Sequence, residues 1–139
     1  MYSRILVTLD TSPADRPLVA HITELARVHG SRVVLVHVAD GWAARHFDTL
    51  KLVESEEMKS DRAYLESQTR LFEAAGVPAE IMLAHGKPPD EILKAAEQQG
   101  CDLIAMATHG HRFLADLVLG STIDTVRHRA RVPLLVVNA

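Results

Sequence analysis

Four short, unbroken apolar runs constrain the fold of this chain more than any other feature. They cover residues 4–9, 32–38, 102–107 and 132–137, and each is rich in β-branched residues or leucine. A strand with one exposed face alternates apolar and polar residues, whereas an unbroken run is typical of a strand covered on both faces. A weaker run at residues 79–84 is a fifth candidate. The sequence therefore predicts five strands, most of them buried.

Helical patterns separate these runs. Residues 14–29 place Leu18, Ile22 and Leu25 on one stripe, and Gly30 follows as a helix stop. Residues 40–50 mix aromatic and polar side chains, and we expect a loop there. Three further helices are expected over about residues 48–75, from Pro88 to Gly100, and from near Ser121 to near Arg129.

Strands and helices thus alternate along the whole chain, which indicates a series of βαβ units. Right-handed crossovers then require a parallel sheet with helices on both faces. The predicted fold is α/β, a Rossmann-like, doubly wound, five-stranded parallel sheet. The chain has 139 residues, of which 47% are hydrophobic and 24% charged, and these values fit one domain spanning residues 1–139.

Charge and cysteine content exclude several classes of function. The 15 Lys and Arg residues against 18 Asp and Glu give a formal charge of −3, so nothing indicates a nucleic-acid-binding surface. A single cysteine, Cys101, excludes an intramolecular disulfide and a Cys-rich zinc site. No run approaches the about 18 apolar residues of a membrane span, and no secretory signal is evident. We therefore expect a cytoplasmic protein with no membrane association.

The fold class predicts where a ligand lies. In an open doubly wound sheet, ligands bind beyond the carboxyl ends of the strands, where the strand order reverses. The segments to inspect therefore follow the predicted strands. They are residues 10–13, Val38, residues 107–110, and residues 120–122 before the last helix.

The last two segments contain a candidate phosphate cradle. Gly110 and Gly120 bracket nine residues, and a glycine lets backbone amides approach an anion closely. Ser121 and Thr122 at a helix start would add hydroxyls and unpaired amides, and His109 would add a donor. The alternative is structural, since Gly110 can simply end a strand while Ser121 caps a helix.

The chain resembles the universal stress protein family. The segments that carry the resemblance are residues 10–13, 35–38, 86–92, 101–110, 119–121 and 132–137, in the family's order. The resemblance covers essentially the whole chain. It implies a five-stranded doubly wound fold and a homodimer in which the final strand pairs with its counterpart in the other subunit.

The nucleotide-binding branch of that family has a glycine motif that this chain matches in part. Gly110, Gly120 and Ser121 match the second glycine, the third glycine and the hydroxyl position, while Ala107 replaces the first glycine. One methyl group at that position is tolerated if the backbone keeps a negative φ; the alternative is that it crowds a phosphate or the ribose.

By the same resemblance, Asp10 faces the adenosine end of the nucleotide, with Thr11 beside it. Val38 lines the adenine pocket and acts through its backbone. The carboxylate of Asp10 can accept hydrogen bonds from two ribose hydroxyls or from the base. Its alternative role is an Asx-type turn formed with Thr11 and Ser12.

Three functions follow from these residues. The first is regulatory binding of ATP or a related adenine nucleotide in the stress response, with Mg²⁺ held mainly by the phosphates. The second is slow nucleotide hydrolysis, for which His109 or His111 is the only candidate base. The third is a dimeric interaction module with an empty pocket. His109 and His111 lack a third ligand at a helpful spacing, so no structural metal site is predicted.

Overall fold

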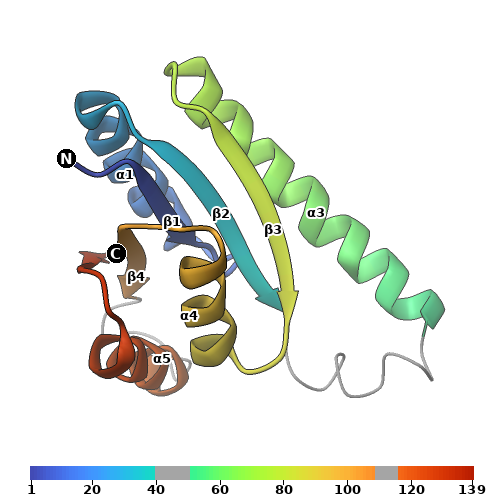
Figure 1. Ribbon diagram of the computed structural model, residues 1–139. Coiled ribbons are helices and arrows are strands. Elements are labelled where there is room, and N and C mark those ends of the chain that lie inside the picture. The colour runs from blue at the N-terminus through green and yellow to red at the C-terminus, as the bar shows by residue number, and fades with distance from the viewer. Residues whose placement is uncertain (40–50, 109–115) are drawn as a thin grey trace.

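The computed structural model describes residues 1–39, 51–108 and 116–139, and for residues 51–55 and 116–120 it describes the backbone alone. Strands and helices alternate along the chain (Figure 1). The strands are β1 (Arg4–Thr8), β2 (Arg32–Ala39), β3 (Ala79–His85), β4 (Leu103–Thr108) and β5 (Leu134–Asn138). The helices are α1 (Asp15–His29), α3 (Lys51–Ala74), α4 (Pro88–Gln98) and α5 (Asp116–Arg129).

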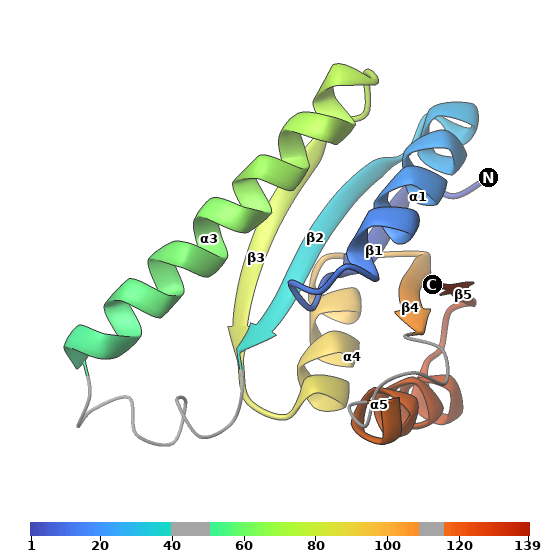
Figure 2. The ribbon, with the colours of Figure 1, turned by 180° about the vertical axis from the view of Figure 1, so that it is seen from behind.

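The strands form one five-stranded sheet in the order β3-β2-β1-β4-β5, and every pairing is parallel. The two views in Figures 1 and 2 show α4 and α5 on one face of this sheet and α1 and α3 on the other. The α/β fold class, the parallel sheet and the helices on both faces were predicted from the sequence and are confirmed.

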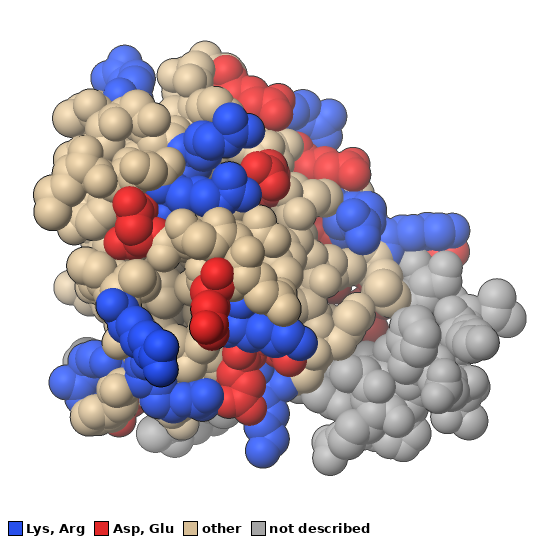
Figure 3. Space-filling model, in the orientation of Figure 1, with Lys and Arg blue, Asp and Glu red and all other residues tan. Residues whose placement is uncertain are grey.

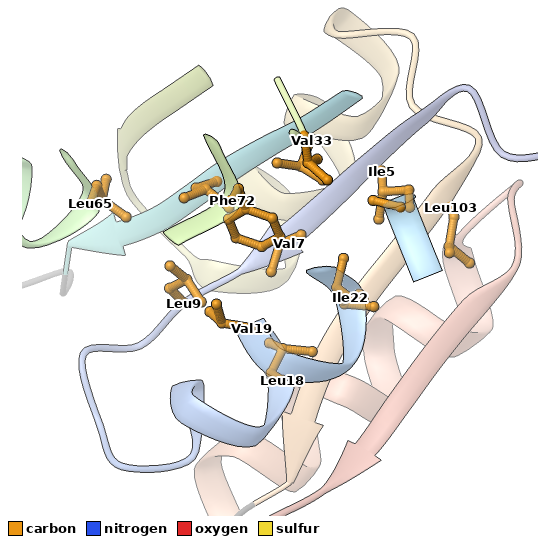
Figure 4. Packing of buried hydrophobic residues seen from close by; sticks show 14 residues of the cluster. Ile5, Val7, Leu9, Leu18, Val19, Ile22, Val33, Leu65, Phe72 and Leu103 are labelled. Carbon is orange, nitrogen blue, oxygen red and sulfur yellow. The ribbon is translucent and has the colours of Figure 1, made fainter. Parts of the chain in front are cut away.

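Each face of the sheet packs against its own pair of helices. Successive residues of β1 alternate between the two layers, since Ile5 and Val7 join the α1–α3 layer while Leu6 joins the α4–α5 layer. Figure 4 shows side chains of β1, α1 and α3 packing in the first layer. This two-sided burial explains why the sequence of β1 reads as an unbroken apolar run.

The predicted end of α1 is also confirmed. Gly30 has φ 66° and its backbone N–H donates to the carbonyl oxygen of Ala26, as in a left-handed helix cap. The next residue, Ser31, donates its N–H to the same carbonyl at 2.8 Å. Glycine suits this position because other residues rarely adopt a positive φ.

The last helix begins earlier than predicted. We expected a start near Ser121, and α5 begins at Asp116. The acidic Asp116 suits the first turn of a helix, and an interior glycine such as Gly120 costs only about 1 kcal/mol, so it does not end the helix. The loop expected at residues 40–50 lies outside the described residues.

Charged side chains of both signs are interspersed on the face shown in Figure 3. Within residues 1–39, 51–108 and 116–139, no helix has the length and apolar character needed to cross a membrane.

Two neighbours in α3 test the packing of the α1–α3 layer. Phe72 is fully buried, whereas Leu71 is 54% exposed. Phe72→Ala should lower the free energy of unfolding by about 3–5 kcal/mol, because it leaves a cavity against the sheet. Leu71→Ala should change it by less than about 0.5 kcal/mol. Urea denaturation measures both, and equal effects of the two substitutions would contradict this packing.

Candidate functional site

A cavity of about 450 Å³ opens at the carboxyl ends of the strands. It lies beside β1, where the strand order reverses between β2 on one side and β4 on the other. Small-molecule sites commonly have volumes of roughly 300–1,000 Å³, so the size fits a ligand of moderate size. The described residues that line it are Thr8, Leu9, Asp10, Thr11, Asp15, Val36, His37, Val38, Ala39, Glu57, Met58, Asp61, His85, Pro88, Ile92, Met106, Ala107 and Thr122.

Five of the nine site residues expected from the sequence line this cavity. Asp10 and Thr11 follow β1, Val38 and Ala107 lie near the ends of β2 and β4, and Thr122 lies in α5. Segments far apart in the sequence therefore meet at one place, as the parallel topology requires.

The remaining expected residues are located differently. His109 and Gly110 lie outside the described residues. Gly120 and Ser121 lie in the second turn of α5, which begins at Asp116. Helical amides beyond the first turn donate to carbonyls one turn earlier. The expectation that Ser121 and Thr122 lie at the helix start, among unpaired amides, is therefore wrong.

Ala107, which the sequence resemblance matched to the first motif glycine, has no backbone strain. It lies in β4, and Thr11 is the non-glycine residue with a positive φ in the described part of the chain. Ala107 therefore keeps the negative φ that an alanine adopts readily. The conformational reason for requiring glycine at this position does not apply.

Asp10 forms the Asx turn that was the alternative to ligand contact. Its Oδ1 accepts hydrogen bonds from the backbone N–H of Ser12 at 3.0 Å and from the Ser12 hydroxyl at 2.5 Å. Asp10 also lines the cavity. The turn holds the carboxylate at the cavity wall, so the structural role and a ligand-binding role are compatible.

Asp15 is a buried carboxylate directly behind this turn. It is 2% exposed, and its Oδ1 accepts the backbone N–H of Asp10 at 3.1 Å. Its Oδ2 accepts the backbone N–H of Thr11 at 2.9 Å and the hydroxyl of Tyr64 at 2.6 Å. Asp15 thus joins the end of β1 to α3.

Burial raises the pKa of Asp15 from 3.8 to about 6. Hydrogen bonds from Tyr64 and from the backbone of Asp10 oppose this rise in pKa, while the negative charge of Asp10 adds to it. Burial also raises the pKa of Tyr64, and its hydrogen bond to Asp15 acts in the same direction.

His37 lies where β1 and β2 part. Its Nδ1 donates to the carbonyl oxygen of Leu9 at 2.8 Å, since a carbonyl can only accept. Its Nε2 lies 3.7 Å from Oδ2 of Asp61 in α3. The backbone N–H of Leu9 donates to the carbonyl oxygen of Val36 in β2 at 2.8 Å. Backbone groups of alternate residues face the same neighbouring strand, so the N–H and C=O of Val38 face the side where β1 has ended.

The described lining of the cavity is acidic. It includes the carboxyl groups of Asp10, Asp15, Glu57 and Asp61, and no Lys or Arg is among the lining residues that the structure describes. Such a wall favours hydroxyl and N–H donors over phosphate groups. Across the described ranges, no cluster of three His, Cys, Asp or Glu residues is arranged to hold a metal ion.

Comparison with known proteins identifies the family. The sequence matches the universal stress protein family over residues 1–138. The chain belongs to the universal stress protein family. One relative, a universal stress protein of Thermus aquaticus, is 32% identical over 143 residues, covering 99% of this chain and 100% of the relative. Universal stress protein MJ0577 of Methanocaldococcus jannaschii is 27% identical over 155 residues, covering 99% of this chain and 96% of the relative.

Solved structures agree with this assignment. The structure of MJ0577 has a TM-score of 0.86 at 26% identity and covers 100% of this chain and 97% of its own. A universal stress protein in complex with cAMP has a TM-score of 0.72 at 20% identity, covering 99% of this chain and 97% of its own. The universal stress protein from Archaeoglobus fulgidus in complex with dAMP has a TM-score of 0.73 at 22% identity, covering 97% of both chains. At these lower identities the likeness shows the fold alone.

Sequence reasoning missed Asp15, Tyr64 and His37 at this site. Asp15 was indistinguishable from an ordinary acidic residue in the first turn of a helix, although its position five residues after Asp10 was a usable signal. Tyr64 is 49 residues from Asp15 in the sequence, and no local pattern connects them.

The raised pKa of Asp15 predicts a pH dependence of stability. Because the folded pKa lies above the unfolded value of 3.8, the stabilising contribution is complete below about pH 4 and is lost as the pH rises through about 6. The free energy of unfolding of the wild type, minus that of Asp15→Asn, should fall by about 2–3 kcal/mol between pH 4 and pH 7. Urea denaturation at both pH values measures it, and a difference that rises with pH would contradict the assignment.

Proposed function

We propose that this protein binds ATP or a related adenine nucleotide as a regulatory ligand, in the cavity at the carboxyl ends of β1, β2 and β4. The observation that carries the proposal is the convergence of Asp10, Val38 and Ala107 on one cavity. These are positions that the resemblance to the nucleotide-binding branch assigns to the nucleotide. The complexes of two structural neighbours with cAMP and dAMP support an adenine nucleotide as the ligand class.

The nucleoside occupies the inner part of the cavity in this proposal. Ribose hydroxyls donate to the carboxylate of Asp10, which the turn holds at the cavity wall. The adenine edge meets the backbone N–H and C=O of Val38. Apolar walls from Val36, Ile92 and Met106 suit the faces of a planar base.

The phosphates point away from the acidic wall in this proposal. Repulsion from Asp10 and Asp61 disfavours phosphate inside the cavity, so the phosphates extend past Ala107 toward Thr122. Gly110, Gly120 and Ser121 remain the proposed phosphate-binding residues, and Gly120 and Ser121 directly precede Thr122 in α5. Mg²⁺ would be held mainly by the phosphates, since it retains several waters and needs few protein ligands.

Calorimetry with ATP and Mg²⁺ tests the proposal. The wild type should bind, and Asp10→Asn should weaken binding at least about tenfold, because it replaces a charged acceptor of the ribose hydroxyls. The control is Glu24→Gln, which removes an exposed carboxylate of α1 that pairs with Arg27 at 2.7 Å. Absence of heat with millimolar ATP would instead favour an interaction module with an empty cavity.

We also propose a homodimer that forms through β5. This strand lies at the edge of the sheet, and Val136 is 37% exposed. The backbone of Pro133 and Ala139 bonds to β4, so by strand alternation the N–H of Val136 faces outward. A partner strand can pair with that edge.

Val136→Pro tests the dimer without breaking the β4–β5 ladder. Proline removes the outward N–H of residue 136, and the inward bonds come from the alternate residues. Light scattering after size exclusion should show a dimer for the wild type and a monomer for Val136→Pro. Val136→Ala keeps the N–H and should remain dimeric. A Val136→Pro dimer would place the interface elsewhere.

A further inference from the structure

Thr11 has an unusual backbone conformation at the cavity wall. Its φ is 66°, which is uncommon for a β-branched residue and strains the backbone. Such a residue persists only when surrounding groups hold it in place. The turn that contains Thr11 also presents the Asp10 carboxylate to the cavity. The groups that hold Thr11 therefore set the position of Asp10.

Asp15 supplies that restraint. A first-turn aspartate ordinarily supports its own helix, but the carboxylate of Asp15 accepts the N–H groups of Asp10 and Thr11, which precede α1. No side chain caps α1 at its N-cap residue, Ala14. The carboxylate of Asp15 therefore hydrogen-bonds to the turn rather than to its own helix. Because Asp15 is almost fully buried, its side chain has little room to rotate away.

Tyr64 fixes Asp15 from the other side. Its hydroxyl donates to Oδ2 of Asp15 at 2.6 Å, the same oxygen that accepts the N–H of Thr11. Tyr64 belongs to α3, whose Leu65 and Phe72 are fully buried against the sheet. A helix packed against the sheet thus holds the carboxylate, and the carboxylate holds the turn.

We propose that Asp15 and Tyr64 are positioning residues for the ligand, which hold the turn after β1 so that Asp10 meets the ribose hydroxyls. This inference rests on the proposed function. It adds a restraint from Asp15, an almost fully buried residue of the cavity lining. Through Asp15 and Asp10, the hydroxyl of Tyr64 acts on the recognition of the ribose.

Tyr64→Phe is the decisive variant, because it removes one hydroxyl and keeps the packed ring. Its affinity for ATP should fall about tenfold, because a loosened turn no longer holds the Asp10 carboxylate toward the ribose hydroxyls. Its affinity for 2′,3′-dideoxy-ATP should change less than about twofold, because that probe lacks both hydroxyls. Asp15→Asn should show the same selective loss. Calorimetry with Mg²⁺ measures the affinity of each variant for each nucleotide, relative to the wild type.

Tyr2→Phe is the matched control. It removes the same hydroxyl from a tyrosine that packs on the ring of His29, at the amino-terminal side of the sheet. Its affinity for both nucleotides should equal that of the wild type.

The outcomes separate the two proposals. Binding by the wild type that is weakened by Asp10→Asn but not by Tyr64→Phe would overturn the positioning role alone. An equal loss of both nucleotides in Tyr64→Phe would also overturn it, since that indicates general loosening of the cavity. No binding of ATP by the wild type would overturn the proposed function and the positioning role together. If Asp15→Asn fails to fold, Tyr64→Phe still decides.

Discussion

The hydrogen bonding of one buried carboxylate, Asp15, determines how the chain leaves the centre of the sheet. β1 is buried on both faces and paired on both edges. The backbone N–H and C=O groups of the turn that follows it therefore need hydrogen-bond partners inside the protein. Asp15 accepts the amides of Asp10 and Thr11, and Tyr64 completes the arrangement from α3. Burial of the carboxylate and the positive φ of Thr11 both cost stability. That cost is consistent with a turn shaped for binding rather than for maximal stability.

The cavity follows from the same geometry. Where β1 ends, β2 continues to Ala39, and His37 donates to the carbonyl oxygen of Leu9, the residue that follows β1. The space between β2 and β4 is therefore left open to a ligand, with apolar walls and a carboxylate at its rim. In the proposed complex, acidic side chains on the described wall favour the nucleoside inside the cavity and the phosphates outside it. Sheet topology thus sets the place of the site, and the side chains at the strand ends set its chemistry.

The fold was predictable because its signals are local. Unbroken apolar runs identified β1, β2 and β4, and Gly30 marked the end of α1 correctly. The segments that line the cavity were predictable too, because parallel strands bring their carboxyl ends to one edge. The start of α5 was not, since Gly120 resembles a helix boundary but costs too little to stop a helix. The contact of Tyr64 with Asp15 depends on the packing of α3 against the sheet, which no local pattern encodes.

We propose that an adenine nucleoside occupies the cavity between the ends of β1, β2 and β4. Amide chemical shifts of ¹⁵N-labelled protein, recorded during a titration with AMP, test it most directly. Binding in this cavity should give the largest shifts at Thr11, Val38 and Ala107, which line it, and negligible shifts at Arg32 and Val77 at the opposite end of the sheet. Shifts concentrated at that opposite end would contradict it.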